Sequence, residues 1–182
     1  YHGDRPEKVK EIGDSAVSDL IIKAEEGVQY NDEIESSYEL ARYTFGLVGD
    51  YDSTMALGNA ALKLSTVKGE KSTYWFDRAL GIYGDNESRL NSAANTALGN
   101  AKNFANAHYW FKQGVEICQR TGYADGFLHA VDIALEMAET DTVSARPWLE
   151  ECVEIVTDGY VLPDDARIQQ LANLMLSMRI SG

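Results

Sequence analysis

The chain has 182 residues, of which 45% are hydrophobic and 25% charged, a composition typical of a soluble globular protein. Its formal charge of −13 argues against nucleic acid and anionic membranes as partners, because both require a basic protein face. Two cysteines are too few for a disulfide framework, three histidines are few for a metal site, and no apolar run approaches the roughly 20 residues that span a bilayer.

Apolar residues recur at helical spacing along the chain, and few residues remain for strands. Asp50 and Ser88 are typical N-cap residues, and glycines follow the ends of four helical segments: Gly49, Gly84, Gly122 and Gly159. The sequence therefore predicts an all-α fold. The nine expected helices lie, in chain order, at residues 6–26, 31–46, 52–66, 70–83, 87–101, 104–120, 124–139, 143–157 and 164–179.

An aromatic motif recurs inside these helices. The segment 74–76, Tyr-Trp-Phe, returns at 109–111 and, as Pro-Trp-Leu, at 147–149, at spacings of 35 and 38 residues. In each copy a small residue lies four positions before the last residue of the motif, and another lies three positions after it. Large residues flanked by small ones on one face allow close helix packing. We therefore expect the three tryptophans in the core.

The pattern resembles the tetratricopeptide repeat family, whose helix–turn–helix units of about 34 residues carry small and aromatic residues at fixed offsets. The resemblance rests on two Ala-Leu-Gly-Asn-Ala segments, 56–60 and 97–101, and on the spacing of Ala107, Phe111 and Gly114. The two segments are 41 residues apart, whereas the Tyr-Trp-Phe copies are 35 apart. Six additional residues are therefore expected between them, and we place them in the connection 65–71.

The resemblance implies a right-handed α–α superhelix, a TPR-like solenoid of about four helix pairs with a C-terminal capping helix. Residues 1–182 are expected to form a single helical-repeat domain, with units at about 7–49, 50–84, 85–122 and 123–159 and the capping helix at 163–180. Proteins of this kind are binding scaffolds, so the resemblance implies a non-enzymatic scaffold or adaptor that receives a peptide or protein partner in a concave groove.

The charge is unevenly distributed. Residues 1–50 carry 12 acids and 5 bases, a net charge of −7, while residues 51–122 are at +2 and residues 123–182 at −8. Seven of the nine asparagines lie between positions 59 and 106. Amide side chains satisfy a peptide backbone without adding charge, and nearby cations favour an acidic group or a terminal carboxylate. The candidate groove residues are Asn59, Lys63, Arg89, Asn91, Asn95 and Lys102.

Two alternatives to this groove hypothesis stay open. The asparagines are also typical of solvated helix surfaces and caps, and a structural protein that self-associates through the solenoid ends fits the same fold. On the helix 52–66, the packed stripe is expected at Leu57, Ala60, Ala61 and Leu64. Met55 and Leu62 are expected on the other side, together with Asn59 and Lys63. The oligomeric state is not predicted.

Enzymatic chemistry has little support in the sequence. His129, Asp132 and Glu136 share one helix face and form a candidate metal cluster, but no second segment supports it. No nucleophile has a recognisable base arrangement. We therefore expect no enzymatic activity, no cofactor and no bound metal, and a protein or peptide rather than nucleic acid or a membrane as the partner.

Both cysteines lie in apolar helical patterns. Cys118 and Cys152 are therefore expected to be buried free thiols, which favours a reducing, cytoplasmic location. The segment 1–6 carries no basic stretch followed by an apolar core, so no signal peptide is visible. A signal peptide removed earlier would leave no trace, and this alternative stays open.

Overall fold

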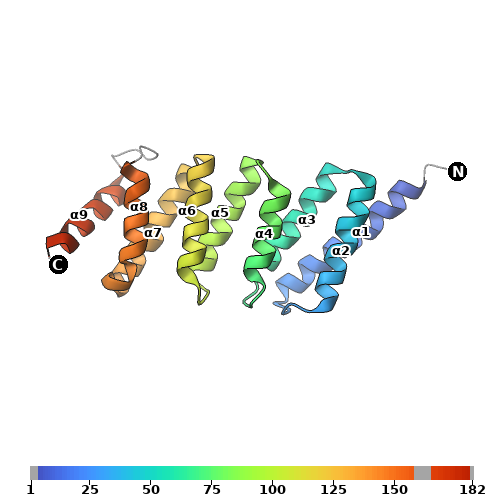
Figure 1. Ribbon diagram of the computed structural model, residues 1–182, viewed down its shortest axis with the longest axis horizontal. Coiled ribbons are helices and arrows are strands. Elements are labelled where there is room, and N and C mark those ends of the chain that lie inside the picture. Colours follow the sequence, from blue (N-terminus) through green and yellow to red (C-terminus); the bar gives the residue numbers. More distant parts are fainter. Residues whose placement is uncertain (1–3, 158–164, 181–182) are drawn as a thin grey trace. The chain divides into compact units, whose positions relative to one another are not determined.

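The computed structural model describes residues 4–157 and 165–180, and within these ranges it contains helices and no strand (Figure 1). The described helices are α1 (Asp4–Glu25), α2 (Asp32–Val48), α3 (Tyr51–Leu64), α4 (Ser72–Tyr83), α5 (Glu87–Ala101), α6 (Ala107–Thr121), α7 (Ala124–Thr140), α8 (Thr142–Thr157) and α9 (Ala166–Ile180). The all-α prediction is confirmed for these residues, and every predicted helix boundary lies within three residues of the observed one.

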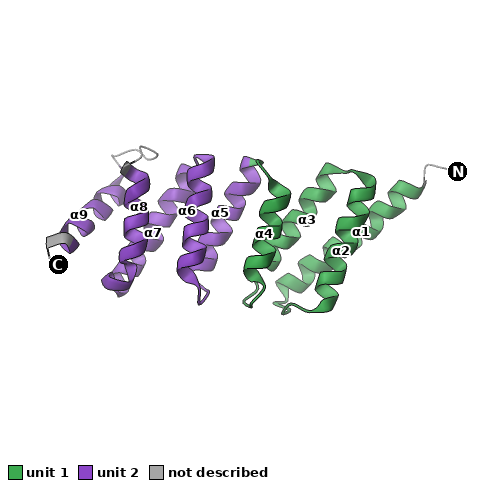
Figure 2. Cartoon of the chain, in the orientation of Figure 1, with its two compact units in different colours: residues 1–86 green, residues 87–182 purple. Residues whose placement is uncertain are grey.

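The chain divides into two compact units, unit 1 at residues 1–86 and unit 2 at residues 87–182 (Figure 2). In unit 1, α1 packs against α2 and α3, and α3 packs against α4. In unit 2, α5 packs against α6, α7 packs against α8, and α9 contacts both α7 and α8. The division falls two residues beyond the expected boundary between the segments 50–84 and 85–122.

Asp50 caps α3 as the sequence predicts, whereas the prediction of Ser88 as an N-cap was wrong, because α5 begins at Glu87 and Ser88 lies inside it. The side chain of Asp50 accepts a hydrogen bond from the backbone N–H of Ser53 at 3.2 Å, which satisfies a donor in the first turn of α3. Three of the four expected glycine caps have the positive φ that favours glycine: Gly49 at 69°, Gly84 at 54° and Gly122 at 67°. The fourth, Gly159, lies outside the described residues.

The recurring aromatic motif forms the centre of each core. Trp75, Trp110 and Trp148 are only 2%, 0% and 4% exposed, so the expectation that they are core residues is confirmed. In unit 1, Trp75 meets Tyr38 edge to face at 5.0 Å between ring centroids. In unit 2, Trp148 stacks on Phe111 at 4.7 Å. Aromatic contacts of this kind add to the stabilisation that burial provides.

The burial of α3 differs from the expectation in one respect. Its packed stripe is buried as predicted, but Met55 and Leu62, expected on the open side, are buried too, at 6% and 9% exposure. The placement of these two residues was therefore wrong. The reason is that α3 has three neighbours within unit 1, because it contacts α1, α2 and α4. A helix enclosed in this way buries more than one stripe.

A glycine allows α1 to lie close against α2. A Cβ atom placed at Gly13 in α1 would come within 2.4 Å of Phe45 Cε1 and 2.5 Å of Thr44 Oγ1, both from α2. At Gly46, on the exposed side of α2, nothing lies within 4 Å of a Cβ atom. The two glycines therefore offer a matched test of helix contact in unit 1.

We expect Gly13→Ala to lower the free energy of unfolding by about 1–3 kcal/mol, because the added methyl group forces Phe45 and Thr44 out of place. The control Gly46→Ala should raise it by roughly 0.5–1 kcal/mol, since alanine favours the helix and meets no neighbour. Urea denaturation followed by circular dichroism measures both. Equal effects of the two substitutions would contradict the close contact between α1 and α2.

We also expect both thiols to be unreactive in the folded protein. Cys118 and Cys152 are 2% and 0% exposed, and burial raises the pKa of Cys118 to about 12 and raises the pKa of Cys152 as well. The reactive thiolate is therefore scarce near neutral pH. A colorimetric thiol reagent should label neither cysteine until urea unfolds the chain, and rapid labelling of the native protein would show that the helices are not packed as described.

Candidate functional site

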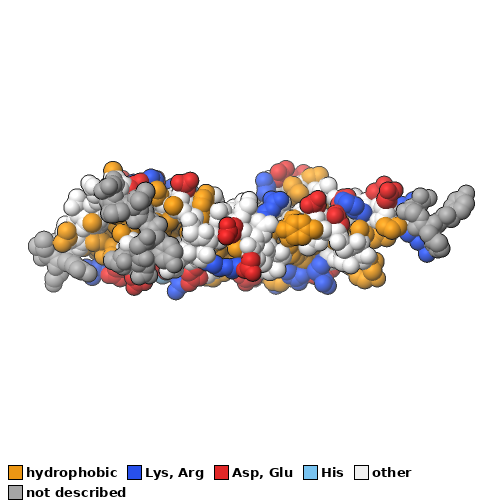
Figure 3. Space-filling view, turned by 90° about the horizontal axis from the view of Figure 1, so that it is seen from above, with side chains coloured by type: hydrophobic (Ala, Val, Ile, Leu, Met, Phe, Trp, Pro, Cys, Tyr) orange, Lys and Arg blue, Asp and Glu red, His pale blue; other side chains and the backbone are white. Residues whose placement is uncertain are grey.

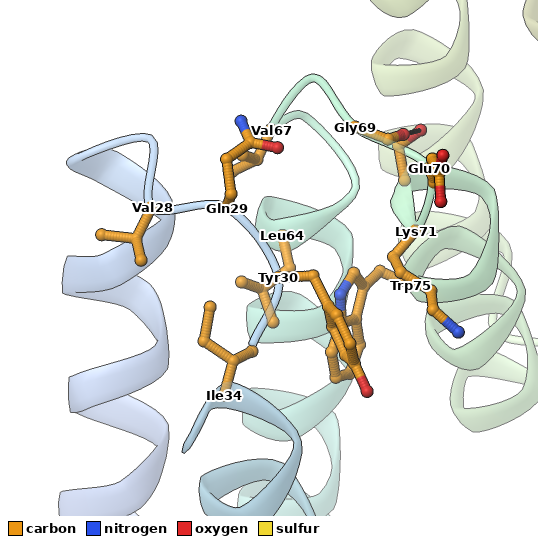
Figure 4. A pocket seen from close by; sticks show the side chains of 11 residues that line it. Val28, Gln29, Tyr30, Ile34, Leu64, Val67, Gly69, Glu70, Lys71 and Trp75 are labelled. Carbon is orange, nitrogen blue, oxygen red and sulfur yellow. Dashed lines mark hydrogen bonds between the residues drawn. The ribbon is translucent and has the colours of Figure 1, made fainter. Parts of the chain in front are cut away.

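Two helix connections enclose a pocket in unit 1 (Figure 4). The α1–α2 connection, residues 26–31, and the α3–α4 connection, residues 65–71, both contribute to its walls, and its volume is about 400 Å³. Its apolar lining consists of Val28, Ile34, Leu64, Val67 and Trp75. A cavity of this size, lined mainly by apolar groups, is in the range of ligand-binding pockets. We call it the aromatic pocket.

The α3–α4 connection is long because α3 stops at Leu64 and α4 starts only at Ser72. The Ser72 hydroxyl donates a hydrogen bond to the carbonyl of Gly69 at 3.0 Å, which turns the chain into α4. The motif spacing places six additional residues in this connection, and that placement was wrong for four of them. The connection has seven residues against five in the α5–α6 connection (102–106), whereas residues 61–64 extend α3 beyond its Ala-Leu-Gly-Asn-Ala segment and α5 ends with its own copy at Ala101. In unit 2 only Asp141 separates α7 from α8, so the corresponding wall is much shorter there.

Aromatic rings and a lysine form one side of the aromatic pocket. Tyr30 and Trp75 lie beside each other with centroids 6.3 Å apart, as Figure 4 shows. The Lys71 ammonium lies 5.2 Å from the Tyr30 ring centroid and 5.1 Å from that of Tyr74. Among the described residues, no carboxylate lies within 4.0 Å of this ammonium group. The pocket therefore combines apolar groups with an acid, Glu70, and with a lysine that forms no salt bridge with the described residues.

Arg78 connects α2 to α4 next to the pocket. Its guanidinium pairs with Glu39 at 2.7 Å and with Glu35 at 3.3 Å, both on α2. It also packs over the rings of Tyr38 and Tyr74, at 4.9 Å from each centroid. The Tyr74 hydroxyl donates a hydrogen bond to Glu35 at 2.8 Å. Because Tyr74 precedes Trp75 in the chain, this network fixes the start of α4 and hence one wall of the pocket.

The network also sets the protonation of its members. Burial alone would raise the pKa of Glu39, but hydrogen bonds from Arg42 and Arg78 outweigh it, and the pKa lies below its usual value. Burial, followed by the hydrogen bond to Glu35, raises the pKa of Tyr74, which keeps its hydroxyl a donor. The charges that hold α2 to α4 therefore persist through neutral pH.

The groove residues predicted in α3 have partners inside unit 1. Asn59 accepts a hydrogen bond from the Tyr83 hydroxyl at 2.9 Å. Lys63 is exposed and pairs with Glu25 of α1 at 3.2 Å. Neither residue lines the aromatic pocket. Both side chains link α3 to a neighbouring helix.

The remaining predicted groove residues belong to unit 2. Asn95 donates a hydrogen bond to the Tyr123 hydroxyl at 3.1 Å. Lys102 pairs with Glu136 at 2.7 Å. The other two are half-buried on α5: Arg89 and Asn91. Oδ1 of Asn91 is buried without a hydrogen-bond partner. The groove hypothesis thus stays a prediction. A ligand in the groove would have to compete with the contacts that Asn95 and Lys102 already make.

The candidate metal cluster on α7 is used for ion pairs. Asp132 pairs with Arg167 of α9 at 3.2 Å, and Glu136 pairs with Lys102. Within the described ranges, no group of three or more histidine, cysteine, aspartate or glutamate side chains is placed to hold a metal ion. His129, Asp132 and Glu136 do lie on one face of α7, but the two acids form ion pairs with cations of neighbouring helices and connections.

A second pocket in unit 2 shows what is specific to the first. It has a volume of about 490 Å³ and lies between the α5–α6 connection and the end of α7, with Phe104 and Trp148 in its lining. Its lysine, Lys102, is neutralised by Glu136, which lines the same pocket. The aromatic pocket also has one acid in its lining, Glu70, but its lysine forms no salt bridge with the described residues, and this distinguishes it from the second cavity.

Comparison of the chain with protein-family models, with curated proteins and with solved structures finds no match. In the part of the chain that the structure describes, no helix is both long and apolar enough to cross a membrane. The geometry of the aromatic pocket is therefore the basis for the function proposed below. Sequence reasoning did not identify this pocket.

We expect Glu39→Gln to lower the free energy of unfolding at neutral pH. The variant should also lose less of this free energy than the wild type when the pH is lowered. Because the folded-state pKa of Glu39 lies below its usual value of 4.5, its contribution is present above that value and is lost as the pH falls below it, through the lowered folded-state pKa. Urea denaturation on both sides of pH 4.5 measures the effect. The control Glu116→Gln removes an exposed acid that faces Lys112 at 3.8 Å and should change little. Parallel acid profiles for wild type and Glu39→Gln would contradict the role of Arg78 as a link.

Proposed function

We propose that this chain is a non-enzymatic interaction module that binds a segment of a partner protein, and that the aromatic pocket anchors a bulky apolar side chain of that segment. The observation that carries the proposal is the pocket itself, about 400 Å³ in volume and walled by Tyr30, Trp75 and apolar side chains. Burial of one large apolar side chain contributes about 1.5–3 kcal/mol, so the anchor supplies part of the binding free energy and neighbouring contacts supply the rest.

The cation beside the pocket suggests the chemistry next to the anchor. Lys71 stands over Tyr30 and Tyr74 without an ion pair to the described residues. An acidic side chain or a terminal carboxylate next to the anchor residue would form an ion pair with the Lys71 ammonium. An ion pair at the edge of a binding site raises the selectivity and the association rate more than it raises the affinity. The proposed ligand is therefore a segment with a large apolar residue followed by a carboxylate.

The arrangement of the helices supports the wider form of this proposal. Within each unit, consecutive helices pack in pairs, as α1 with α2 or α5 with α6. We propose that these pairs continue as a right-handed, tetratricopeptide-like superhelix, capped by α9. Its concave groove would carry the rest of the partner segment along Asn59, Lys63, Arg89, Asn91, Asn95 and Lys102.

A peptide array tests the anchor. Peptides that pair a large apolar residue with a carboxylate should bind the wild-type chain, and Val67→Asp should weaken binding by about tenfold or more. The new carboxylate lies in the apolar lining and repels an acidic ligand. Val143→Asp is the matched control, because Val143 is an 83% exposed valine of unit 2 that lies in none of the pockets described above. Circular dichroism confirms that both variants are folded.

Two outcomes would contradict the proposal. One is an array in which no peptide with a large apolar residue binds the wild-type chain. The other is binding that Val67→Asp and Val143→Asp affect equally, because the pocket would then not be the binding site. A shift of the Trp75 indole N–H resonance on ligand addition, without a matching shift for Trp110 or Trp148, is the expected spectroscopic result.

A further inference from the structure

An apolar stripe runs along the exposed face of α2. Leu40, Tyr43 and Leu47 are 46%, 64% and 62% exposed, and their spacing of three and four residues places them on one side of the helix. The stripe spans seven positions, or about 10 Å along the helix axis. Ile12 of the neighbouring helix α1 is also exposed, at 50%. Figure 3 shows hydrophobic side chains exposed over α1 and α2 among charged ones.

A hollow lies beside this stripe. It has a volume of about 600 Å³ and is formed between α1 and α2, with Ile12, Ala16 and Leu40 as its apolar lining. The buried face of α2 is a different one, carried by residues such as Ile34 and Phe45. The stripe and hollow therefore form an apolar face of unit 1 that no described helix of that unit covers, and we call them the α1–α2 face.

Acidic groups border the α1–α2 face. Glu11 and Asp19 of α1 line the hollow, and Glu33 lies about two turns before the stripe on α2. Lys23 is held between Asp19 and Glu33, at 2.8 Å from each, so its charge is already neutralised. Lys8 is the remaining base in the lining of the hollow. Together these three acids and two bases carry a net charge of −1, so the border is mildly acidic.

The charge selects among possible occupants. The first 50 residues carry a net charge of −7, so a second copy docked by the same face would bring two acidic surfaces together. Like charges across an interface oppose association, whereas opposite charges favour it. A partner with basic groups around a row of apolar residues would match both the apolar stripe and the acidic border of the face.

We propose that the α1–α2 face docks a basic amphipathic helix of a partner protein. Such a helix places apolar residues at positions i, i+3 or i+4, and i+7 against the stripe, and its lysines or arginines reach the acidic border. This surface is separate from the aromatic pocket, and it adds a second contact to the function proposed above rather than depending on it.

Synthetic peptides of about 18 residues test the proposal on the full chain. One peptide carries leucines in a helical stripe and lysines elsewhere, the second has the same stripe with glutamates, and the third is a scrambled form of the lysine peptide. The amphipathic lysine peptide should bind about tenfold more tightly than either of the other two, with binding weakened by salt. The double variant Leu40→Gln/Leu47→Gln should lose about tenfold in affinity. Leu176→Gln, which removes a 58% exposed leucine of α9, should lose none.

Each other result would overturn the proposal. Equal binding of the lysine and glutamate peptides would remove the charge argument, and equal binding of the scrambled peptide would show simple attraction to an acidic protein. A dimer of the chain that Leu40→Gln/Leu47→Gln converts to a monomer would assign the face to a second copy. Unchanged affinity in the double variant would place the peptide elsewhere, and no binding of the lysine peptide would leave the face without this partner.

Discussion

The packing of Trp75 is the contact on which unit 1 depends. Its ring lies 5.0 Å from that of Tyr38 on α2, 5.0 Å from that of Tyr74 and 6.3 Å from that of Tyr30, which comes from the α1–α2 connection. One side chain of α4 thus contacts both the helix and the connection of the preceding pair. Arg78 strengthens the same junction through Glu35 and Glu39. The aromatic pocket exists because this junction holds two connections apart above an apolar lining.

The two pockets show how the same arrangement gives different chemistry. In unit 2, Lys102 meets Glu136 at 2.7 Å, so the cation at the pocket is satisfied within the chain. In unit 1, Lys71 lies on aromatic faces instead, and ring contacts leave its charge available to a ligand. Lys71 is the last residue of the α3–α4 connection, whereas Lys102 is the first residue after α5.

The sequence predicts the helices well because helical periodicity and caps are local signals. The burial of Trp110 and the positive φ of Gly122 follow from the same patterns. The pocket is harder to predict, because Tyr30 and Lys71 are 41 residues apart and meet only through the packing of α4. The partners of Asn59 and Lys102 also depend on tertiary contacts, since each bonds a residue at least 24 positions away. Motif spacing showed that six residues are added between the two motifs, but it did not show that four of them, residues 61–64, extend α3 and only two lengthen the connection.

Nuclear Overhauser contacts between a bound peptide and the protein test the central claim most directly. A peptide with an isotope-labelled apolar residue next to a carboxylate should show contacts from that residue to the rings of Tyr30 and Trp75 and to the methyl groups of Val67. Contacts confined to α3 near Asn59 or to α5 near Asn95 would contradict the aromatic pocket as the anchor and would favour the groove instead.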